Sequence, residues 1–207
     1  MDDDAALNPF LRSTLGALAD VNLQALQLML GFIESDRVPR GFAVLGEIAP
    51  DLVRLDRDGI RRLAAMPHLL VDLNFRDVDW WRGTRYESLR AVAIADRLTR
   101  LARPRLLALS RATITLVWHV VRIDQAEAAL LLGLSEDVAR ELSQWSPDDV
   151  QRVAERQALR IRPRWSNRPQ VWQQWIEAAS SDDAEAMRRM RVHGLQLLGS
   201  EARRAAS

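Results

Sequence analysis

Residues 132–165 read LGLSEDVARELSQWSPDDVQRVAERQALRIRPRW, a stretch with two helix starts, a short alternating segment and a dense group of arginines. Residues 48–75 read IAPDLVRLDRDGIRRLAAMPHLLVDLNF and run through the same features in the same order. An offset of 90 residues aligns the two stretches, with identities at Asp58/Asp148, Arg62/Arg152, Ala64/Ala154 and Leu69/Leu159. Because an internal repeat decides the architecture of a chain, we predict two similar halves.

Helical periodicity dominates the remaining sequence and predicts a mostly α fold. Two long apolar helices are expected at about residues 12–34 and 105–122, in corresponding places of the two halves. Shorter helices are expected at about residues 42–47, 50–55, 56–65, 85–101 and 126–132, and further ones begin near Ser135, Ser146, Asn167 and Ser181. The last helix should end near Leu198, with residues 199–207 forming a frayed tail.

Local signals place several boundaries. Residues 146–149, Ser-Pro-Asp-Asp, combine a cap, a proline in the first turn and two acids at the positive end of the helix dipole. Asp56 or Asp58 can cap an earlier helix, and Gly133 favours a helix end. Residues 69–75 and 159–165 alternate as extended strands do. Between these features, Trp80 and Trp81 are expected in a polar loop, and Pro104 in the joint between the halves.

Composition indicates an ordinary soluble globular protein. The chain has 207 residues, of which 48% are hydrophobic and 28% charged. It has no cysteine, which excludes disulfides, thiol catalysis and cysteine metal sites. The first residues, MDDDAALNPF, are acidic where a signal peptide would be basic, and no apolar run reaches the roughly 18–20 residues that a membrane span needs. We expect a cytoplasmic protein.

Arginine supplies all 29 basic residues, and six of them fall between Gln151 and Arg168 against a single acid, Glu155. Such a local excess in a near-neutral protein can attract phosphate. The predicted DNA-binding residues are Arg152, Arg156, Arg160, Arg162, Arg164 and Arg168. Arg160, Arg162 and Arg164 alternate with Leu159, Ile161 and Pro163, so they should share one face of an extended segment. The alternatives are a solvated rim or a docking surface for an acidic partner.

Seven tryptophans are many for this length. Trp165, Trp172 and Trp175 lie among the arginines, and such mixtures can bind single strands. Trp80, Trp81, Trp172 and Trp175 are candidate partner-binding residues. The alternative is that these rings are anchors of the core or of an interface.

Nothing in the sequence predicts catalysis. His68, His119 and His193 are scattered without zinc-site spacing, and His119, on an apolar helix, should be buried or partly buried. There is no glycine-rich phosphate loop and no nucleophile elbow. The paired acids at 148–149 and 182–183 begin helices, where capping explains them. We expect no enzyme, no cofactor and no metal.

Residues 126–165 resemble the FlhD family of flagellar transcriptional activators. The similar positions are Ala128-Ala129 before Leu132-Gly133, then residues 134–139 (LSEDVA), Leu142 and residues 150–155. The first half carries similar marks at residues 21–23, 45–46 and 62–64. An FlhD chain is about half as long as this one. The resemblance therefore covers the protein as two tandem copies, residues 1–103 and 104–207.

FlhD-family proteins are α-helical dimers that associate with the zinc-bearing FlhC and activate flagellar promoters. The resemblance implies that the two copies form an intramolecular pseudo-dimer. The first copy is degenerate, with Leu70, Asp72 and Asn74 where the second has Arg160, Arg162 and Arg164. Neither copy has the interface cysteine of the family.

The resemblance implies a DNA-associated transcriptional regulator of FlhD type, acting with an FlhC-like regulator on flagellar or related genes. A second interpretation is an interaction module that has lost promoter binding and binds or sequesters a regulator. An enzyme with an unrecognised site is a third. DNA and an FlhC-like regulator are the expected partners; a membrane and a small-molecule substrate are not expected. The pseudo-dimer leaves further oligomerisation open.

Overall fold

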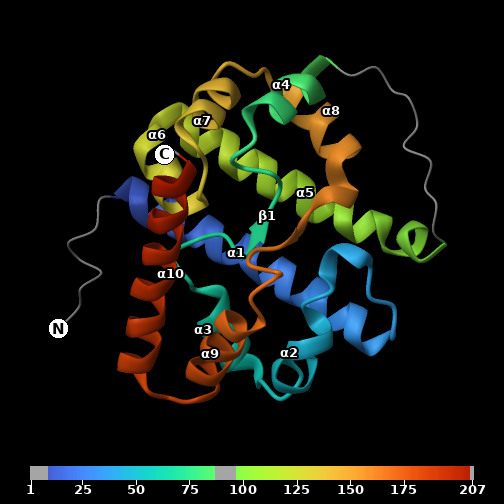
Figure 1. Ribbon diagram of the computed structural model, residues 1–207, viewed down its shortest axis with the longest axis vertical. Coiled ribbons are helices and arrows are strands. Elements are labelled where there is room, and N and C mark those ends of the chain that lie inside the picture. The colour runs from blue at the N-terminus through green and yellow to red at the C-terminus, as the bar shows by residue number, and fades with distance from the viewer. Residues whose placement is uncertain (1–8, 87–96, 206–207) are drawn as a thin grey trace.

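The computed structural model describes residues 9–86 and 97–205, and it confirms the mostly α prediction (Figure 1). The only sheet in these residues has two short strands, β1 (Val71–Asp72) and β2 (Arg162–Pro163). The helices are α1 (Pro9–Glu34), α2 (Leu45–Leu52), α3 (Arg57–Ala64), α4 (Val78–Tyr86), α5 (Arg97–Ile123), α6 (Gln125–Leu132), α7 (Glu136–Ser143), α8 (Pro147–Gln157), α9 (Pro169–Ser180) and α10 (Ala184–Ala205), with 3-10 turns η2 (Arg40–Phe42) and η3 (Ala158–Arg160).

The two long helices α1 and α5 cross the middle of the molecule and pack against each other (Figure 1). Leu18, Ala25 and Met29 of α1 are fully buried, as is Ile114 of α5. By length and composition alone, α1 and residues 103–123 are each apolar enough to span a membrane. This corrects the expectation that no segment is long enough. Within the protein, 44% and 50% of the residues in the two apolar windows are buried.

Predicted caps hold several helices in place. Ser146 and Asp149 form a reciprocal capping box at the start of α8, with Pro147 in its first turn. The Asp56 carboxylate accepts a hydrogen bond from the Gly59 amide at the start of α3. Gly133 ends α6 in the left-handed conformation, with φ 68°. These local signals confirm the predicted boundaries of α3, α6 and α8.

The two alternating segments meet, but only their centres are strands. β1 and β2 pair in antiparallel register, with Val71 opposite Pro163 and Asp72 opposite Arg162. The first segment turns after Asp72, because its carboxylate accepts hydrogen bonds from the amides of Asn74 and Phe75. In the second segment residues 158–160 form η3, so the predicted strands were too long.

Elements in corresponding places make corresponding contacts. The order α1, α2, α3, β1, α4 is followed by α5, α7, α8, β2, α9, with α6 and α10 as additional helices. Helix α1 packs on α2 and α3, and α5 packs on α7 and α8. Helix α4 lies on α7 and α8, whereas α9 lies on α2 and α3 (Figure 1). The last helix of each series therefore covers the other series.

Several local predictions were wrong. Trp80 and Trp81 lie in α4 rather than in a loop, because the Asp77 carboxylate accepts the Trp80 amide and starts a helix there. Pro104 lies inside α5 instead of in a joint. Pro50 is likewise inside α2, not in its first turn.

Three further expectations also need correction. Asn167 does not cap α9, whose capping position is Arg168 without a side-chain hydrogen bond. The expected frayed tail is helical to Ala205, because α10 packs on α6 and Leu198 is buried. His119 is exposed, not buried. The helix expected at 85–101 falls largely outside the described residues.

Candidate functional site

The six predicted DNA-binding arginines do not form one surface. Arg152 and Arg156 lie on α8, Arg160 ends η3, and Arg162 lies in β2. The expectation that Arg160, Arg162 and Arg164 share one face is wrong, because η3 replaces the extended backbone and Arg164 is only 5% exposed. Arg164 therefore contributes no charge to the outer surface.

Arg164 is held inside the protein by the end of α6. Its Nη2 donates a hydrogen bond of 2.8 Å to the carbonyl of Leu132, and its guanidinium lies 5.9 Å from the ring of Phe75 and 5.7 Å from that of Trp165. Burial lowers the pKa of Arg164, while Asp72 and Glu201 act against that shift. The guanidinium thus complements the negative end of a helix.

Arg162 reaches across the two-stranded sheet. Its Nη2 lies 2.7 Å from Asp72 Oδ2 and 3.0 Å from Asn74 Oδ1. Burial raises the pKa of Asp72, but the charges of Arg164 and Arg162 outweigh burial and hold that pKa below its ordinary value. Arg162 is therefore already engaged within the protein, although its side chain is half-exposed.

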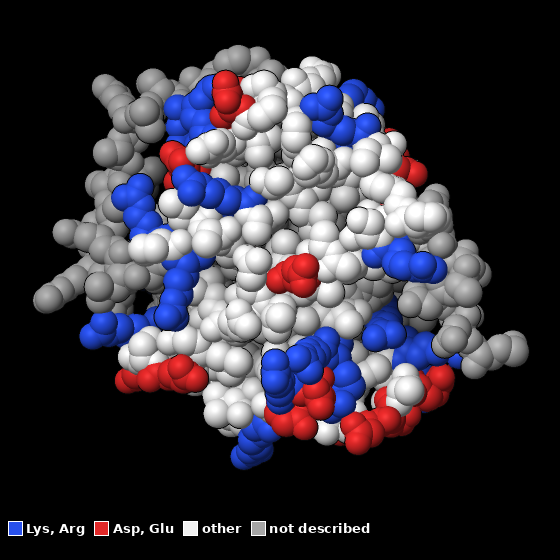
Figure 2. All heavy atoms as spheres, turned by 180° about the vertical axis from the view of Figure 1, so that it is seen from behind, with Lys and Arg blue, Asp and Glu red and all other residues white. Residues whose placement is uncertain are grey.

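The remaining arginines of the predicted set, Arg152, Arg156, Arg160 and Arg168, keep at least part of their surface accessible. Arg152 forms an ion pair with Asp149 at 3.2 Å. The single acid of this stretch, Glu155, is bound by Arg111 of α5. Figure 2 shows one face of the molecule, where arginines stand in separate groups, several of them beside acids. The wide area between these groups is mostly white, with acidic atoms near its centre.

Three of the four candidate partner-binding tryptophans are core residues. Trp81, Trp172 and Trp175 are fully buried, and only Trp80 is partly exposed. Trp81 stacks on Phe75, whereas Trp172 packs edge-on against Trp175. The core interpretation therefore fits these three rings, and they are closed to a partner in this conformation.

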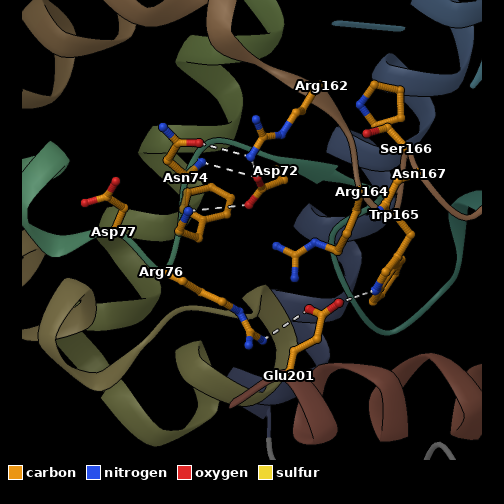
Figure 3. Close-up of a pocket in the computed structure, with 12 residues that line it drawn as sticks. Asp72, Asn74, Arg76, Asp77, Arg162, Arg164, Trp165, Ser166, Asn167 and Glu201 are labelled. Carbon is orange, nitrogen blue, oxygen red and sulfur yellow. Dashed lines mark hydrogen bonds and ion pairs between the residues drawn. The ribbon is translucent and has the colours of Figure 1, made fainter. Parts of the chain in front are cut away.

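A cavity of about 530 Å³ opens where the two segments meet. Its lining pairs positions that the 90-residue offset aligns, such as Asp72 with Arg162, Asn74 with Arg164 and Phe75 with Trp165. Asn74 and Trp165 both have left-handed backbone, with φ 52° and 51°, an uncommon conformation that concentrates at functional sites. The full lining is Asp72, Asn74, Phe75, Arg76, Asp77, Arg162, Pro163, Arg164, Trp165, Ser166, Asn167 and Glu201 (Figure 3).

Glu201 of α10 closes one side of this cavity. Its Oε2 lies 3.4 Å from Arg76 Nη2, and its Oε1 accepts a hydrogen bond of 2.6 Å from Trp165 Nε1 (Figure 3). Burial lowers the pKa of Arg76, while Glu201 and Asp72 oppose the shift. Sequence reasoning missed Glu201, which fell in the expected tail. The contrast between Asp72 and Arg162 at aligned positions was the one available signal for the cavity.

His68 lies next to this region and is fully buried. Its ring packs 5.4 Å from Trp165 and 5.1 Å from Trp175, and Nδ1 lies 3.3 Å from the carbonyl of Leu69. Burial lowers the pKa of His68 to about 3, and the charges of Arg164 and His193 act in the same direction. The neutral, tightly packed ring of His68 therefore has a structural role. The described residues contain no cluster of three metal-ligating side chains.

A family model matches one continuous part of the chain, which includes α6, α7, α8, β2 and α9. Residues 109–194 match the model of the flagellar transcriptional activator (FlhD) family. The FlhD-like segment, as we call residues 109–194, starts within α5, ends within α10 and contains all six predicted arginines. Asp72, Arg76 and Glu201 lie outside it. No curated protein matches the chain, and no solved structure does.

Proposed function

We propose that the protein is a DNA-associated transcriptional regulator of FlhD type, in which two FlhD-like halves pair within one chain. The match of residues 109–194 supports the FlhD-like character of the second half. The expected boundary between residues 103 and 104 falls within α5, so the second half is better taken from Arg97 onward.

The observation that carries the proposal is the reciprocal exchange of α4 and α9. Each helix leaves its own series and packs on the two short helices of the other. A two-fold dimer makes each contact twice, once from either subunit. The reciprocal contacts within this one chain have that pattern. Burying both apolar faces within one polypeptide makes folding independent of protein concentration.

Matching hydrogen bonds support the same pairing. Asn22 Nδ2 on α1 donates to the carbonyl of Ala64 at 3.1 Å, and Ser110 Oγ on α5 donates to the carbonyl of Ala154 at 3.0 Å. Ala64 and Ala154 are aligned identities of the two halves. Asn22 and Ser110 differ in type, yet each donates a hydrogen bond from the long helix of its half to the carbonyl of the aligned alanine in that half. This is expected for two copies that have diverged.

DNA contact would rest on four arginines, namely Arg152, Arg156, Arg160 and Arg168. They lie on α8, at the end of η3 and at the start of α9, within the FlhD-like segment. Arginine can neutralise backbone phosphates from such positions. The regulator acts in the cytoplasm, without catalysis, together with an FlhC-like protein.

Fluorescence anisotropy with flagellar promoter DNA, measured over a salt series with and without the FlhC protein of the same cell, tests this function. Arg152→Ala with Arg160→Ala should weaken binding and reduce the salt slope by about two. Arg54→Ala with Arg188→Ala is the matched control, because both residues are exposed and each pairs with an acid one helical turn away. Equal binding by both double variants across the series would refute DNA contact through these arginines.

A specific observation also favours the alternative, an interaction module without DNA binding. Arg164 is buried and Arg162 is bound by Asp72, so the basic face is smaller than the sequence predicts. A pulldown with FlhC followed by a gel shift separates the two functions. Capture of FlhC without a shift of promoter DNA supports the alternative.

A further inference from the structure

The cavity where the two segments meet contains a buried arginine that lacks an ion-pair partner in the part of the chain that the structure describes. Arg164 is the most buried of its arginines, its Nε has no hydrogen-bond partner, and it forms no ion pair with any described residue. Its Nη2 is satisfied only by the carbonyl of Leu132. Buried charges in proteins are normally paired with an opposite charge, because removing an ion from water is costly.

The two nearest carboxylates are already occupied by other groups. Asp72 forms an ion pair with Arg162 at 2.7 Å and accepts two backbone amides. Glu201 lies between Arg76 and the indole N–H of Trp165.

The lining as a whole has three arginines and three acids, Asp77 being the third acid, so its formal charges balance. The group without a counter-charge of its own is Arg164, which is buried and forms no ion pair with any described residue. The carbonyl end of α6 supplies only a partial negative charge, about half an elementary charge.

We propose that this cavity binds a small molecule bearing a single oxyanion group, which lies against Arg164 with Arg76 and Arg162 on either side. Figure 3 shows these three side chains reaching into the same space from different parts of the chain. An oxyanion is the group that guanidinium donors bind best, through paired N–H bonds. This ligand is distinct from DNA, because Arg164 is buried and a DNA duplex cannot reach it.

The lining also limits the ligand. The volume of about 530 Å³ suits a small molecule. Phe75 and Trp165 provide aromatic walls, and Ser166 and Asn167 offer polar groups to hydroxyls of the ligand. Asp77, an exposed acid of the lining, would repel a second negative charge. The preferred ligand therefore carries one anionic end and an uncharged polar body.

The test is a titration of the full-length protein, followed by ¹⁵N–¹H NMR, with inorganic phosphate and separately with lactate. Chloride at the same ionic strength is the reference. Binding should shift the indole N–H signal of Trp165 more than that of Trp118, which lies outside the cavity and donates to Trp145. Phosphate and lactate also distinguish a phosphate-bearing ligand from a carboxylate. No saturable shift with either anion would overturn the proposal.

Variants locate the site. Arg164→Gln should weaken binding at least about tenfold, the effect of losing a charged hydrogen bond. Because that change also removes the cap of α6, Ser166→Leu serves as a second variant that narrows the cavity without touching a guanidinium. Arg188→Gln, an exposed arginine outside the cavity, is the control and should bind as the wild type. Equal affinity of Ser166→Leu and Arg188→Gln would place any observed binding elsewhere and refute this site.

Discussion

Asp72 and Arg162 stand 90 residues apart in the chain and directly opposite each other in the antiparallel sheet, with an ion pair of 2.7 Å between their side chains. They are also the positions that the repeat alignment treats as equivalent. When two equivalent segments pair in antiparallel fashion about a two-fold axis, the residue on the axis meets its own counterpart. A homodimer would place two identical side chains there, whereas one chain can place opposite charges.

Charge changes at this pair test its role. Asp72→Arg or Arg162→Asp places like charges opposite each other. Arg162→Asp should lower the free energy of unfolding by about 1 kcal/mol, since like charges across a sheet repel and residue 162 is partly screened by solvent. Asp72→Arg should lower it further, because it also removes the hydrogen bonds from the amides of Asn74 and Phe75. The double exchange, Asp72→Arg with Arg162→Asp, should be more stable than Asp72→Arg alone, because it restores opposite charges although not the hydrogen bonds to the two amides. Urea unfolding measures all three. A double variant less stable than both single variants would show that the pairing contributes nothing.

Gly133 should not tolerate a side chain. Its φ of 68° disfavours any other residue, and an added Cβ would overlap Arg164 Nη1 and lie 2.8 Å from Leu198 Cδ2. Gly133→Ala should therefore destabilise the protein by more than about 2 kcal/mol. Gly16→Ala on the exposed side of α1, where an added Cβ meets nothing within 4 Å, should stabilise it by about 0.5–1 kcal/mol. Thermal unfolding of Gly133→Ala and Gly16→Ala, each compared with the wild type, measures both changes in stability.

His68 should make stability depend on pH. Burial lowers the pKa of the folded ring to about 3 from the ordinary value of 6.5, so between these two values the unfolded chain binds a proton that the folded chain does not. The contribution of His68 to stability is therefore fully present above pH 6.5. It decreases by about 1.4 kcal/mol per pH unit as the pH falls from 6.5 toward 3. Arg164 and His193, the charged groups that act on this ring, lower its pKa further.

His68→Leu removes this proton and should flatten the pH dependence. The informative window lies between pH 6.5 and 3.8, because Asp72, whose pKa is also lowered, contributes only below its ordinary value of 3.8. Chemical unfolding at several pH values compares the variant with the wild type. Parallel stability curves for the two proteins in that window would contradict the assignment.

The parts of the fold predicted best were those controlled by local chemistry. Ser146 and Asp149 cap α8, and Gly133 ends α6, because each depends on backbone groups a few residues away. The boundaries predicted worst depend on distant packing. Pro104 remains within α5, and α10 continues past Leu198. Proline and small polar residues predict the end of a helix only weakly when tertiary contacts favour its continuation.

The site was only partly predictable. The charge excess between Gln151 and Arg168 identified the arginines, but not that Arg164 turns inward to the end of α6. Periodicity cannot distinguish an exposed alternating face from one that crosses another strand. The cavity is built by segments far apart in the chain, since Asp72, Arg76 and Glu201 all lie outside the arginine-rich stretch of residues 151–168.

The most direct test of the paired halves is a disulfide between Asp72→Cys and Arg162→Cys in the full-length chain. The protein has no native cysteine, so the pair would be the only thiols present. Directly opposed antiparallel positions have a geometry that permits a disulfide. We predict that mild oxidation of dilute protein gives a monomeric band of altered mobility on a non-reducing gel, which reduction reverses. Free thiols after oxidation, or disulfide-linked dimers alone, would contradict the intramolecular pairing.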